Sequence, residues 1–213
     1  MTIISAENNI ATVILLFQVD PNLQTALIDA AKENSQKVME KKPGFISTNL
    51  HKSFDGTSMV NYAQWETKKS YEEAINFLKP DEVKLGEKIF GMADPDWNIY
   101  NLVFSTGRVP TTISQDNNLV TVINKFSVEP ENQKKLIKLL DDLREIVEKL
   151  PGFISANVHR SLDGTRIVSY AQWNSKEDYQ AVYTNSQATP ILDEIKKISK
   201  FTWNIYEVVY SHD

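Results

Sequence analysis

Length, composition and charge place the chain among ordinary globular proteins and exclude several classes of function. The 213 residues are 41% hydrophobic and 24% charged, and 23 Lys and Arg against 28 Asp and Glu give a net charge of −5, which disfavours binding to nucleic acid or to an anionic membrane surface. The chain has no cysteine, which excludes disulfides, thiolate catalysis, zinc–thiolate sites and iron–sulfur clusters.

The N-terminal sequence and the absence of long apolar runs predict a cytoplasmic protein. Residues 1–9 show no basic segment followed by an apolar core, so we expect no signal peptide. No apolar run approaches the roughly 18 residues that a membrane-spanning helix needs. A chain without cysteine also fits a reducing compartment. We therefore expect neither a membrane nor a nucleic acid as a partner.

The same sequence pattern occurs twice in the chain. Residues 43–65 read PGFISTNLHKSFDGTSMVNYAQW and residues 151–173 read PGFISANVHRSLDGTRIVSYAQW, so 16 of 23 positions are identical. The similarity extends outward on both sides, to Trp97-Asn98-Ile99-Tyr100 and Trp203-Asn204-Ile205-Tyr206 among others. Two copies of about 100 residues are too few and too long for a solenoid, and each is long enough for a small domain.

A polar segment separates the two copies. It contains Gly107 and Pro110 and shows no hydrophobic periodicity, which is typical of a linker. We therefore predict one repeat at 1–105, a linker at 106–117 and a second repeat at 118–213.

Each copy predicts the element order β-α-β-β-α-β. Alternating β-branched residues indicate strands, an apolar stripe at helical spacing indicates a helix, and Asp-Gly between alternating segments indicates a hairpin. In the first copy these are strand 10–19, helix 22–41, a hairpin around Asp55-Gly56, helix 68–90 with a break at Pro80, and strand 97–105. In the second copy they are strand 119–128, helix 131–149, a hairpin around Asp163-Gly164, helix 176–200 with a break at Pro190, and strand 203–211.

This element order is the ferredoxin-like arrangement, which packs both helices on one face of a four-stranded antiparallel sheet. The other face is left bare and needs a partner. The second copy can supply it, so we predict an α+β fold in which the two repeats form a dimeric α+β barrel as a pseudo-dimer within one chain. The space between the two sheets is then the expected ligand cavity. Pairing between two chains, as a homodimer, stays open.

The repeated motifs resemble those of a known family. The residues that carry the resemblance are Pro43 to Ser47, His51-Lys52-Ser53, Asp55-Gly56-Thr57 and Tyr62-Ala63-Gln64-Trp65, with their counterparts in the second copy. The chain resembles the antibiotic biosynthesis monooxygenase family of dimeric α+β barrels. The resemblance implies a cofactor-independent monooxygenase that oxidises a small aromatic, polyphenolic substrate to a quinone with O2, and needs neither a cofactor nor a metal.

The resemblance also implies a set of catalytic residues in the first copy. The phenol oxygenases of the family use a strand Asn, a Trp four residues later and a Tyr six residues after that, and Asn61, Trp65 and Tyr71 have this spacing. Asn61 and Trp65 alternate with period two and so share one face of their strand. Both can donate hydrogen bonds to a phenolate or carbonyl oxygen, and Tyr71 can relay a proton. The alternative is that Trp65 and Tyr71 only fill space.

A second site stays open in the second copy. Ser169, Trp173 and Tyr179 have the same spacing, but Ser169 replaces the Asn. Asn124 is a polar residue in an apolar strand, and the resemblance implies that it donates to the substrate oxygen. Its alternative is a solvent-facing position beside Lys125.

His51 and His159 are candidate auxiliary residues, because histidine is a good general base near neutral pH. If Asp55-Gly56 forms a two-residue turn, His51 lies opposite Val60 and points away from Trp65. A bulged turn reverses this orientation. The alternative role of both histidines is structural.

Two other functions compete with the oxygenase. The fold tolerates loss of chemistry, so a non-catalytic small-molecule-binding or stress-response barrel is the main alternative. Haem-degrading relatives bind iron through a His on the second helix, and segments 68–90 and 176–200 contain no His, which disfavours haem.

Overall fold

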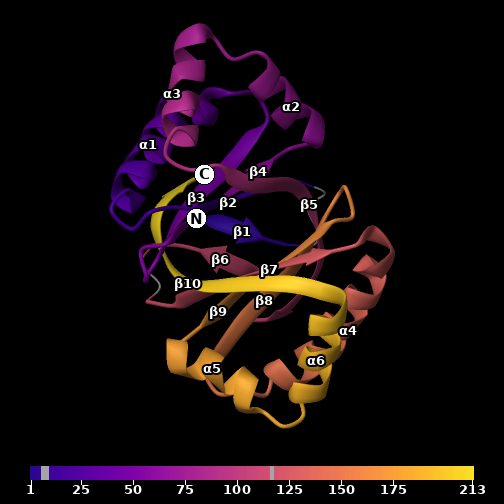
Figure 1. Ribbon diagram of the computed structural model, residues 1–213. Helices are drawn as coiled ribbons and strands as arrows, with labels where there is room; N and C mark the ends of the chain where they lie inside the picture. Colours follow the sequence, from indigo (N-terminus) through magenta and orange to yellow (C-terminus); the bar gives the residue numbers. More distant parts are fainter. Residues whose placement is uncertain (6–9, 116–117) are drawn as a thin grey trace.

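The computed structural model describes residues 1–5, 10–115 and 118–213, and shows two halves with the same element order (Figure 1). The first half comprises β1 (Thr2–Ile4), β2 (Ala11–Gln18), α1 (Gln24–Lys37), a 3-10 turn (Met39–Lys41), β3 (Phe45–Ser53), β4 (Ser58–Trp65), α2 (Lys68–Asn76), α3 (Pro80–Phe90) and β5 (Pro95–Gly107). The second half comprises β6 (Thr111–Ile113), β7 (Val120–Val128), a 3-10 turn (Pro130–Asn132), α4 (Gln133–Val147), β8 (Phe153–Ser161), β9 (Arg166–Trp173), α5 (Lys176–Thr184), α6 (Thr189–Ile198) and β10 (Ser199–His212). The predicted β-α-β-β-α-β order is confirmed in both halves.

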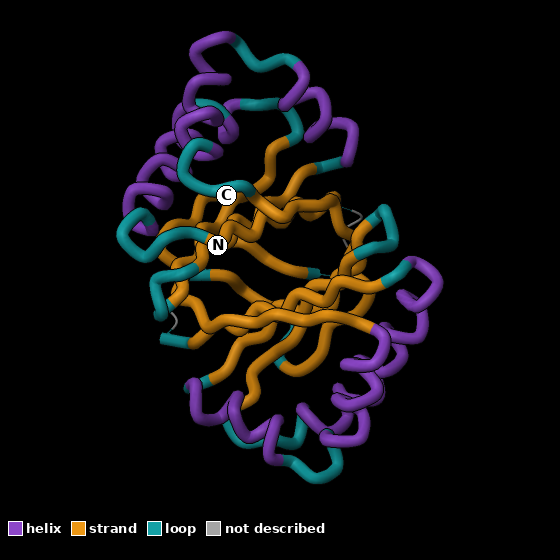
Figure 2. Tube along the Cα trace, viewed as in Figure 1, coloured by secondary structure: helices purple, strands orange, loops and turns teal. Residues whose placement is uncertain are grey.

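Eight strands form one closed antiparallel barrel, in the order β10-β3-β4-β2-β5-β8-β9-β7. The last strand of each half closes the barrel by pairing with the other half, β5 with β8 and β10 with β3. Helices α1–α3 cover the outside of the barrel on one side and helices α4–α6 cover it on the opposite side (Figure 2). The predicted α+β barrel, formed as a pseudo-dimer within one chain, is confirmed. No helix in the described part of the chain is both long and apolar enough to cross a bilayer.

The repeated Asp-Gly pairs form the predicted hairpin turns. Gly56 and Gly164 adopt φ of +79° and +80°, a conformation that is strained for residues with a side chain. Asp55 Oδ1 accepts hydrogen bonds from Ser53 and from the backbone and side chain of Thr57, which closes the turn. The proline breaks are confirmed as well, since α3 begins at Pro80 and Pro190 lies in the first turn of α6.

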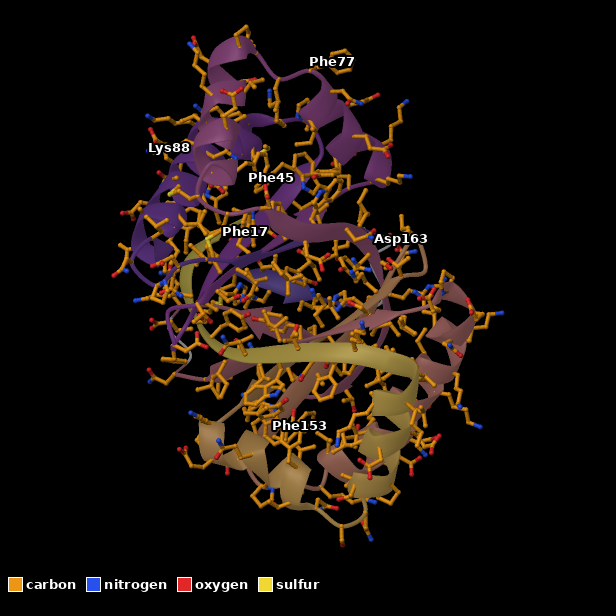
Figure 3. The ribbon with its side chains drawn as sticks, viewed as in Figure 1. Phe17, Phe45, Phe77, Lys88, Phe153 and Asp163 are labelled. Atoms are coloured by element: carbon orange, nitrogen blue, oxygen red, sulfur yellow. The ribbon has the colours of Figure 1, made fainter. Side chains whose placement is uncertain are left out.

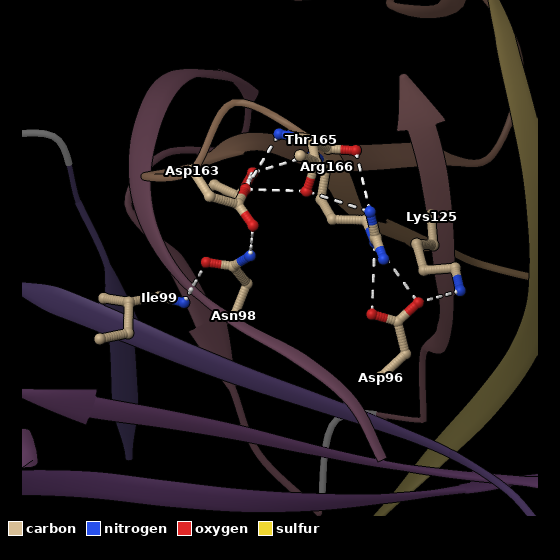
Figure 4. Close-up of polar contacts among 8 residues, drawn as sticks. Asp96, Asn98, Ile99, Lys125, Asp163, Thr165 and Arg166 are labelled. Atoms are coloured by element: carbon tan, nitrogen blue, oxygen red, sulfur yellow. Dashed lines mark hydrogen bonds and ion pairs between the residues drawn. The ribbon is translucent and has the colours of Figure 1, made fainter. Parts of the chain in front are cut away.

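The repeated Trp-Asn-Ile-Tyr motif joins the two halves at the same turns. Asn98 Nδ2 donates to Asp163, and Asn204 Nδ2 donates to Asp55 at 2.8 Å, so each motif holds the hairpin of the other half. On one side of the barrel an ion cluster adds to this seam, because Asp96 of β5 binds both Lys125 and Arg166 (Figure 4). The halves therefore close on each other through polar contacts as well as strand pairing.

The middle of the barrel interior is filled, and a space of about 380 Å³ remains at one end, lined by Leu16, Ile123 and Tyr206 among others. Asn61 and Trp65 do not line it, so the expectation that their ligand cavity lies between the two sheets is wrong. Strands β1 and β6 form an antiparallel ribbon inside the barrel, where Ile4 and Ile113 pack against Tyr62 and Tyr170 (Figure 1). Matching amides anchor the ribbon: Asn49 donates to Thr2 and Asn157 to Thr111, both at 2.9 Å, while Gln64 and Gln172 donate to the carbonyls of Ile3 and Thr112.

The segment predicted as a linker also contributes to this ribbon. Part of segment 106–117 is ordered as the end of β5 and as β6, and its last two residues, 116–117, lie outside the described residues. Thr2-Ile3-Ile4-Ser5 and Thr111-Thr112-Ile113-Ser114 are short copies of each other, a signal that the sequence analysis missed. The division into domains at 1–105 and 118–213 stays a proposal.

Candidate functional site

A cavity of about 550 Å³ lies between the sheet and the helices of the first half. Its floor is the outward face of β2 and β4, which carries Asn61 and Trp65, and α1, α2 and α3 cover it. The volume falls within the roughly 300–1,000 Å³ of small-molecule sites. Phe90 and Trp97 line it and are 51% and 49% exposed, so the cavity has an aromatic mouth open to solvent. It therefore lies outside the barrel, on the opposite face of the sheet from the one expected.

The structure brings Asn61, Trp65 and Tyr71 together in this cavity. Thr48 Oγ1 donates to Asn61 Oδ1 at 2.8 Å and so fixes the orientation of the amide. The ring centroids of Trp65 and Tyr71 lie 5.6 Å apart, edge to face, and Tyr71 in turn contacts Trp97. The shared face predicted for Asn61 and Trp65 is confirmed, since both line the same cavity.

These three residues present hydrogen-bond donors without protein partners. Within residues 1–5, 10–115 and 118–213, Asn61 Nδ2, Trp65 Nε1 and the Tyr71 hydroxyl make no hydrogen bond to the protein. Burial raises the pKa of Tyr71 to about 12, so its hydroxyl stays protonated at neutral pH. Donors that converge on an apolar cavity with no partner are suited to bind an oxygen of a guest molecule.

The corresponding space in the second half is nearly closed, at about 90 Å³. Larger side chains fill it: Leu140 stands where the first half has Ala31, Tyr183 stands where it has Ile75, and Phe201 stands where it has Pro95. Figure 3 shows Phe45 and Phe153 at corresponding places in the two halves. The two halves therefore share a fold but not a cavity.

The residues predicted to form a second site do line this small space, but Asn124 and Tyr179 hydrogen-bond to each other. The Tyr179 hydroxyl donates to Asn124 Oδ1 at 2.8 Å and lies 2.9 Å from the Tyr183 hydroxyl. Ser169 lines the same space, and Trp173 Nε1 is buried without a hydrogen-bond partner in the described part of the chain. Asn124 therefore holds Tyr179 rather than facing solvent, and the space cannot admit a polycyclic ligand.

His51 and His159 lie inside the barrel, fully buried, and do not reach the cavity. His51 is paired with Val60, as the two-residue turn predicts, and so points to the sheet face opposite Trp65. His51 Nε2 lies 3.1 Å from the Tyr170 hydroxyl, and His159 Nε2 lies 3.0 Å from that of Tyr62. Their position fits a structural role. It does not fit the role of an auxiliary base at the cavity.

Sequence reasoning missed two carboxylates that line the cavity, Glu72 of α2 and Glu82 of α3. Glu82 Oε2 accepts hydrogen bonds from Lys42 Nζ and from the backbone N–H of Lys79, both at 2.8 Å. The hydrogen bond from Lys42 and that from the Lys79 backbone hold the pKa of Glu82 below its usual value. The repeat gave no signal for the Lys42–Glu82 pair, because the second half has Leu150 at the position of Lys42. In the described residues, no group of three or more His, Asp or Glu could hold a metal ion.

Comparison with known proteins identifies the family. Residues 10–76 and 119–188 match the sequence pattern of the Antibiotic biosynthesis monooxygenase family, one segment in each half. The chain belongs to this family. Membership confirms the resemblance drawn from the repeated motifs and the expected class of enzyme. Tetracenomycin-F1 monooxygenase of Streptomyces glaucescens is 37% identical over 101 residues, which are 47% of this chain and 90% of that protein.

The fold of the chain is similar to that of two solved structures. An anthrone oxidase-like protein superimposes with a TM-score of 0.87 at 22% identity, over 99% of this chain and 96% of that one. A major regulator of staphylococcal pathogenesis superimposes with a TM-score of 0.55 at 11% identity, over 93% of this chain and 99% of that one. At these identities the likeness shows the fold alone, and this fold also occurs in a regulator.

Proposed function

We propose that the first half is a cofactor-independent monooxygenase that oxidises a planar polycyclic phenol to a quinone with O2. The observation that carries the proposal is the cavity of about 550 Å³ that Asn61, Trp65 and Tyr71 line with donors that have no partner among the described residues. Membership of the family and the relative named as a monooxygenase support the type of reaction. The partners are then a small aromatic substrate and O2, while a homodimer and a cytoplasmic location stay predictions.

In this proposal the substrate itself reduces the oxygen. Its phenolate or enolate anion passes one electron to O2, and the resulting radical pair combines to form a carbon–oxygen bond. For an anthrone, one oxygen atom becomes the new carbonyl and the other leaves as water with the two methylene hydrogens. All four electrons come from the substrate, so no other reductant is needed.

The residues of the cavity have distinct parts in this sequence. Asn61 Nδ2 and Trp65 Nε1 donate to the oxygen of the substrate anion and favour its formation. Tyr71, with its protonated hydroxyl, passes a proton from the substrate to water at the mouth and returns one to the departing peroxide oxygen. Apolar walls limit the access of water to the radical pair.

Oxygen uptake tests the proposed function directly. The full chain, with a metal chelator present, is mixed with a panel of polycyclic phenols that includes a hydroxyanthrone. We expect one O2 consumed for each quinone formed, at a rate that the chelator does not change. A panel in which no member increases oxygen uptake over the uncatalysed rate would count against an oxygenase and favour the non-catalytic binding barrel.

We further propose one binding site in each chain, in the first half. The substitutions Ala31→Leu and Ile75→Tyr place in the first half side chains of the kind that fill the second. Because these side chains extend into existing space, we expect a Tm that does not fall and an affinity for a hydroxyanthraquinone that drops at least tenfold. Fluorescence titration measures the affinity, and the unaltered chain should bind one ligand. A stoichiometry of two, or an unchanged affinity in the double variant, would contradict the proposal.

A further inference from the structure

The cavity has hydrogen-bond groups of opposite kind on its floor and on its roof. On the floor, Asn61 and Trp65 of β4 present donors. On the roof, two carboxylates line the cavity and can only accept: Glu72 of α2, which is half-exposed and paired with Lys68, and the more enclosed Glu82 of α3. Apolar side chains that include Phe90 and Ile89 also line the cavity. A ligand that satisfies both walls must carry an acceptor oxygen at one end and a hydroxyl at the other.

One oxygen of Glu82 is available for such a hydroxyl. Both protein partners, Lys42 Nζ and the Lys79 N–H, bind Oε2, and in the described part of the chain no donor binds Oε1. The Lys42–Glu82 pair is also largely enclosed, with 15% and 21% of the two side chains exposed. The carboxylate is therefore held in place by groups on one side, with its second oxygen unused.

We propose that Glu82 is a specificity-determining residue, which accepts a hydrogen bond from a hydroxyl on the substrate ring remote from the reacting carbon. This inference rests on the proposed function, because it assumes a polycyclic phenol in the cavity. It narrows the substrate class to phenols that carry a free hydroxyl on an outer ring, away from both the oxyanion and the reacting carbon. A methyl ether at that position cannot donate, and it leaves Glu82 Oε1 without a partner.

A neutral isostere tests the role without removing the cap of α3. The Glu82 side chain accepts from the Lys79 N–H in a capping arrangement, and glutamine fills the same position in such caps. Glu82→Gln therefore removes the charge and keeps the local structure. Glu87→Gln is the matched control, because Glu87 lies on the same helix, is exposed and does not line the cavity.

The measurement is the affinity for 2-hydroxyanthraquinone and for its methyl ether, by quenching of tryptophan fluorescence at pH 6, where the hydroxyl is protonated. We expect the unaltered chain and Glu87→Gln to prefer the hydroxyl compound by about tenfold, and Glu82→Gln to show a preference of about twofold or less. An equal preference in Glu82→Gln and the unaltered chain overturns the inference, as does failure of the unaltered chain to bind either quinone. Quinone binding needs neither O2 nor turnover, so a negative oxygen-uptake assay leaves this test valid.

Discussion

Asn61→Ala is expected to lower kcat for quinone formation from a hydroxyanthrone by about 10²- to 10³-fold, the usual cost of losing one oxyanion donor. Thr48 fixes the Asn61 amide through its oxygen, and Asn61 Nδ2 makes no hydrogen bond within the described residues, so alanine removes a donor that is free to bind the substrate anion. Steady-state oxygen uptake gives kcat and KM separately. Because the donor acts on developing charge, the change falls mainly on kcat.

Trp65→Phe is the companion change, since it keeps an aromatic ring and removes the Nε1 donor. The second half supplies matched controls: Ser169→Ala and Trp173→Phe alter the corresponding positions around a space of about 90 Å³, which admits no substrate. We expect these two controls to oxidise the hydroxyanthrone at the unaltered rate. Unchanged quinone formation by Asn61→Ala and Trp65→Phe would reject the proposed roles.

Much of the fold could be predicted because local signals and the repeat agreed with each other. Asp-Gly turns at residues 55–56 and 163–164 set the hairpin register, and that register placed His51 opposite Val60. The period-two spacing of Asn61 and Trp65 predicted one shared face, and both side chains line one cavity. Self-similarity then predicted that each half would cover the sheet of the other.

The position of the cavity could not be predicted, because it depends on what fills the barrel. A sheet strand has two faces, and period two does not say which one faces the partner sheet. The middle of the interior is occupied by the ribbon of β1 and β6, two three-residue strands whose repeat signal is very short. With the middle of the interior filled, the only large apolar space that meets Asn61 and Trp65 in the described residues lies beneath the helices.

The residue differences that make the two cavities unequal are visible in the sequence, but the sequence does not show that these residues line a cavity. Ala31 against Leu140 and Ile75 against Tyr183 are unremarkable differences until both members of each pair are known to face the sheet. The Asn61 and Ser169 difference was visible at once, and in the structure Ser169 lines the smaller of the two spaces. The second half keeps its role in closing the barrel, which needs strand pairing and not a cavity.

The barrel interior contains a symmetric pair of contacts that ties the halves together. His51 of the first half meets Tyr170 of the second, and Tyr62 of the first half meets His159 of the second. The Nδ1 atoms lie 3.1 Å and 3.2 Å from the carbonyls of Asn49 and Asn157. A carbonyl only accepts, so each Nδ1 carries a proton, and because burial lowers the pKa of both histidines to about 4, each Nε2 is unprotonated at neutral pH and accepts from a tyrosine hydroxyl. Both histidines are therefore neutral in the folded protein.

This arrangement predicts a loss of stability as the pH falls from 6.5 toward 4. Burial lowers the pKa of both His51 and His159 to about 4, against 6.5 in the unfolded chain, so the unfolded chain binds protons first. Stability is complete above pH 6.5. Between pH 7 and pH 5 we expect a loss of about 2 kcal/mol for each histidine, or about 4 kcal/mol in total. Denaturant unfolding at a series of pH values measures it.

The two turn aspartates titrate below this pH window. Asp55 and Asp163 have pKa values of about 2, held there against the effect of burial by hydrogen bonds in their turns, so their contribution is lost only below about pH 4. The double variant His51→Gln/His159→Gln should be less stable at pH 7 but should lose far less stability between pH 7 and pH 5. His212→Gln, at an exposed histidine, should keep the steep dependence. An equally steep dependence in the double variant would show that the buried histidines do not control acid stability, and that the two halves are held together by other contacts.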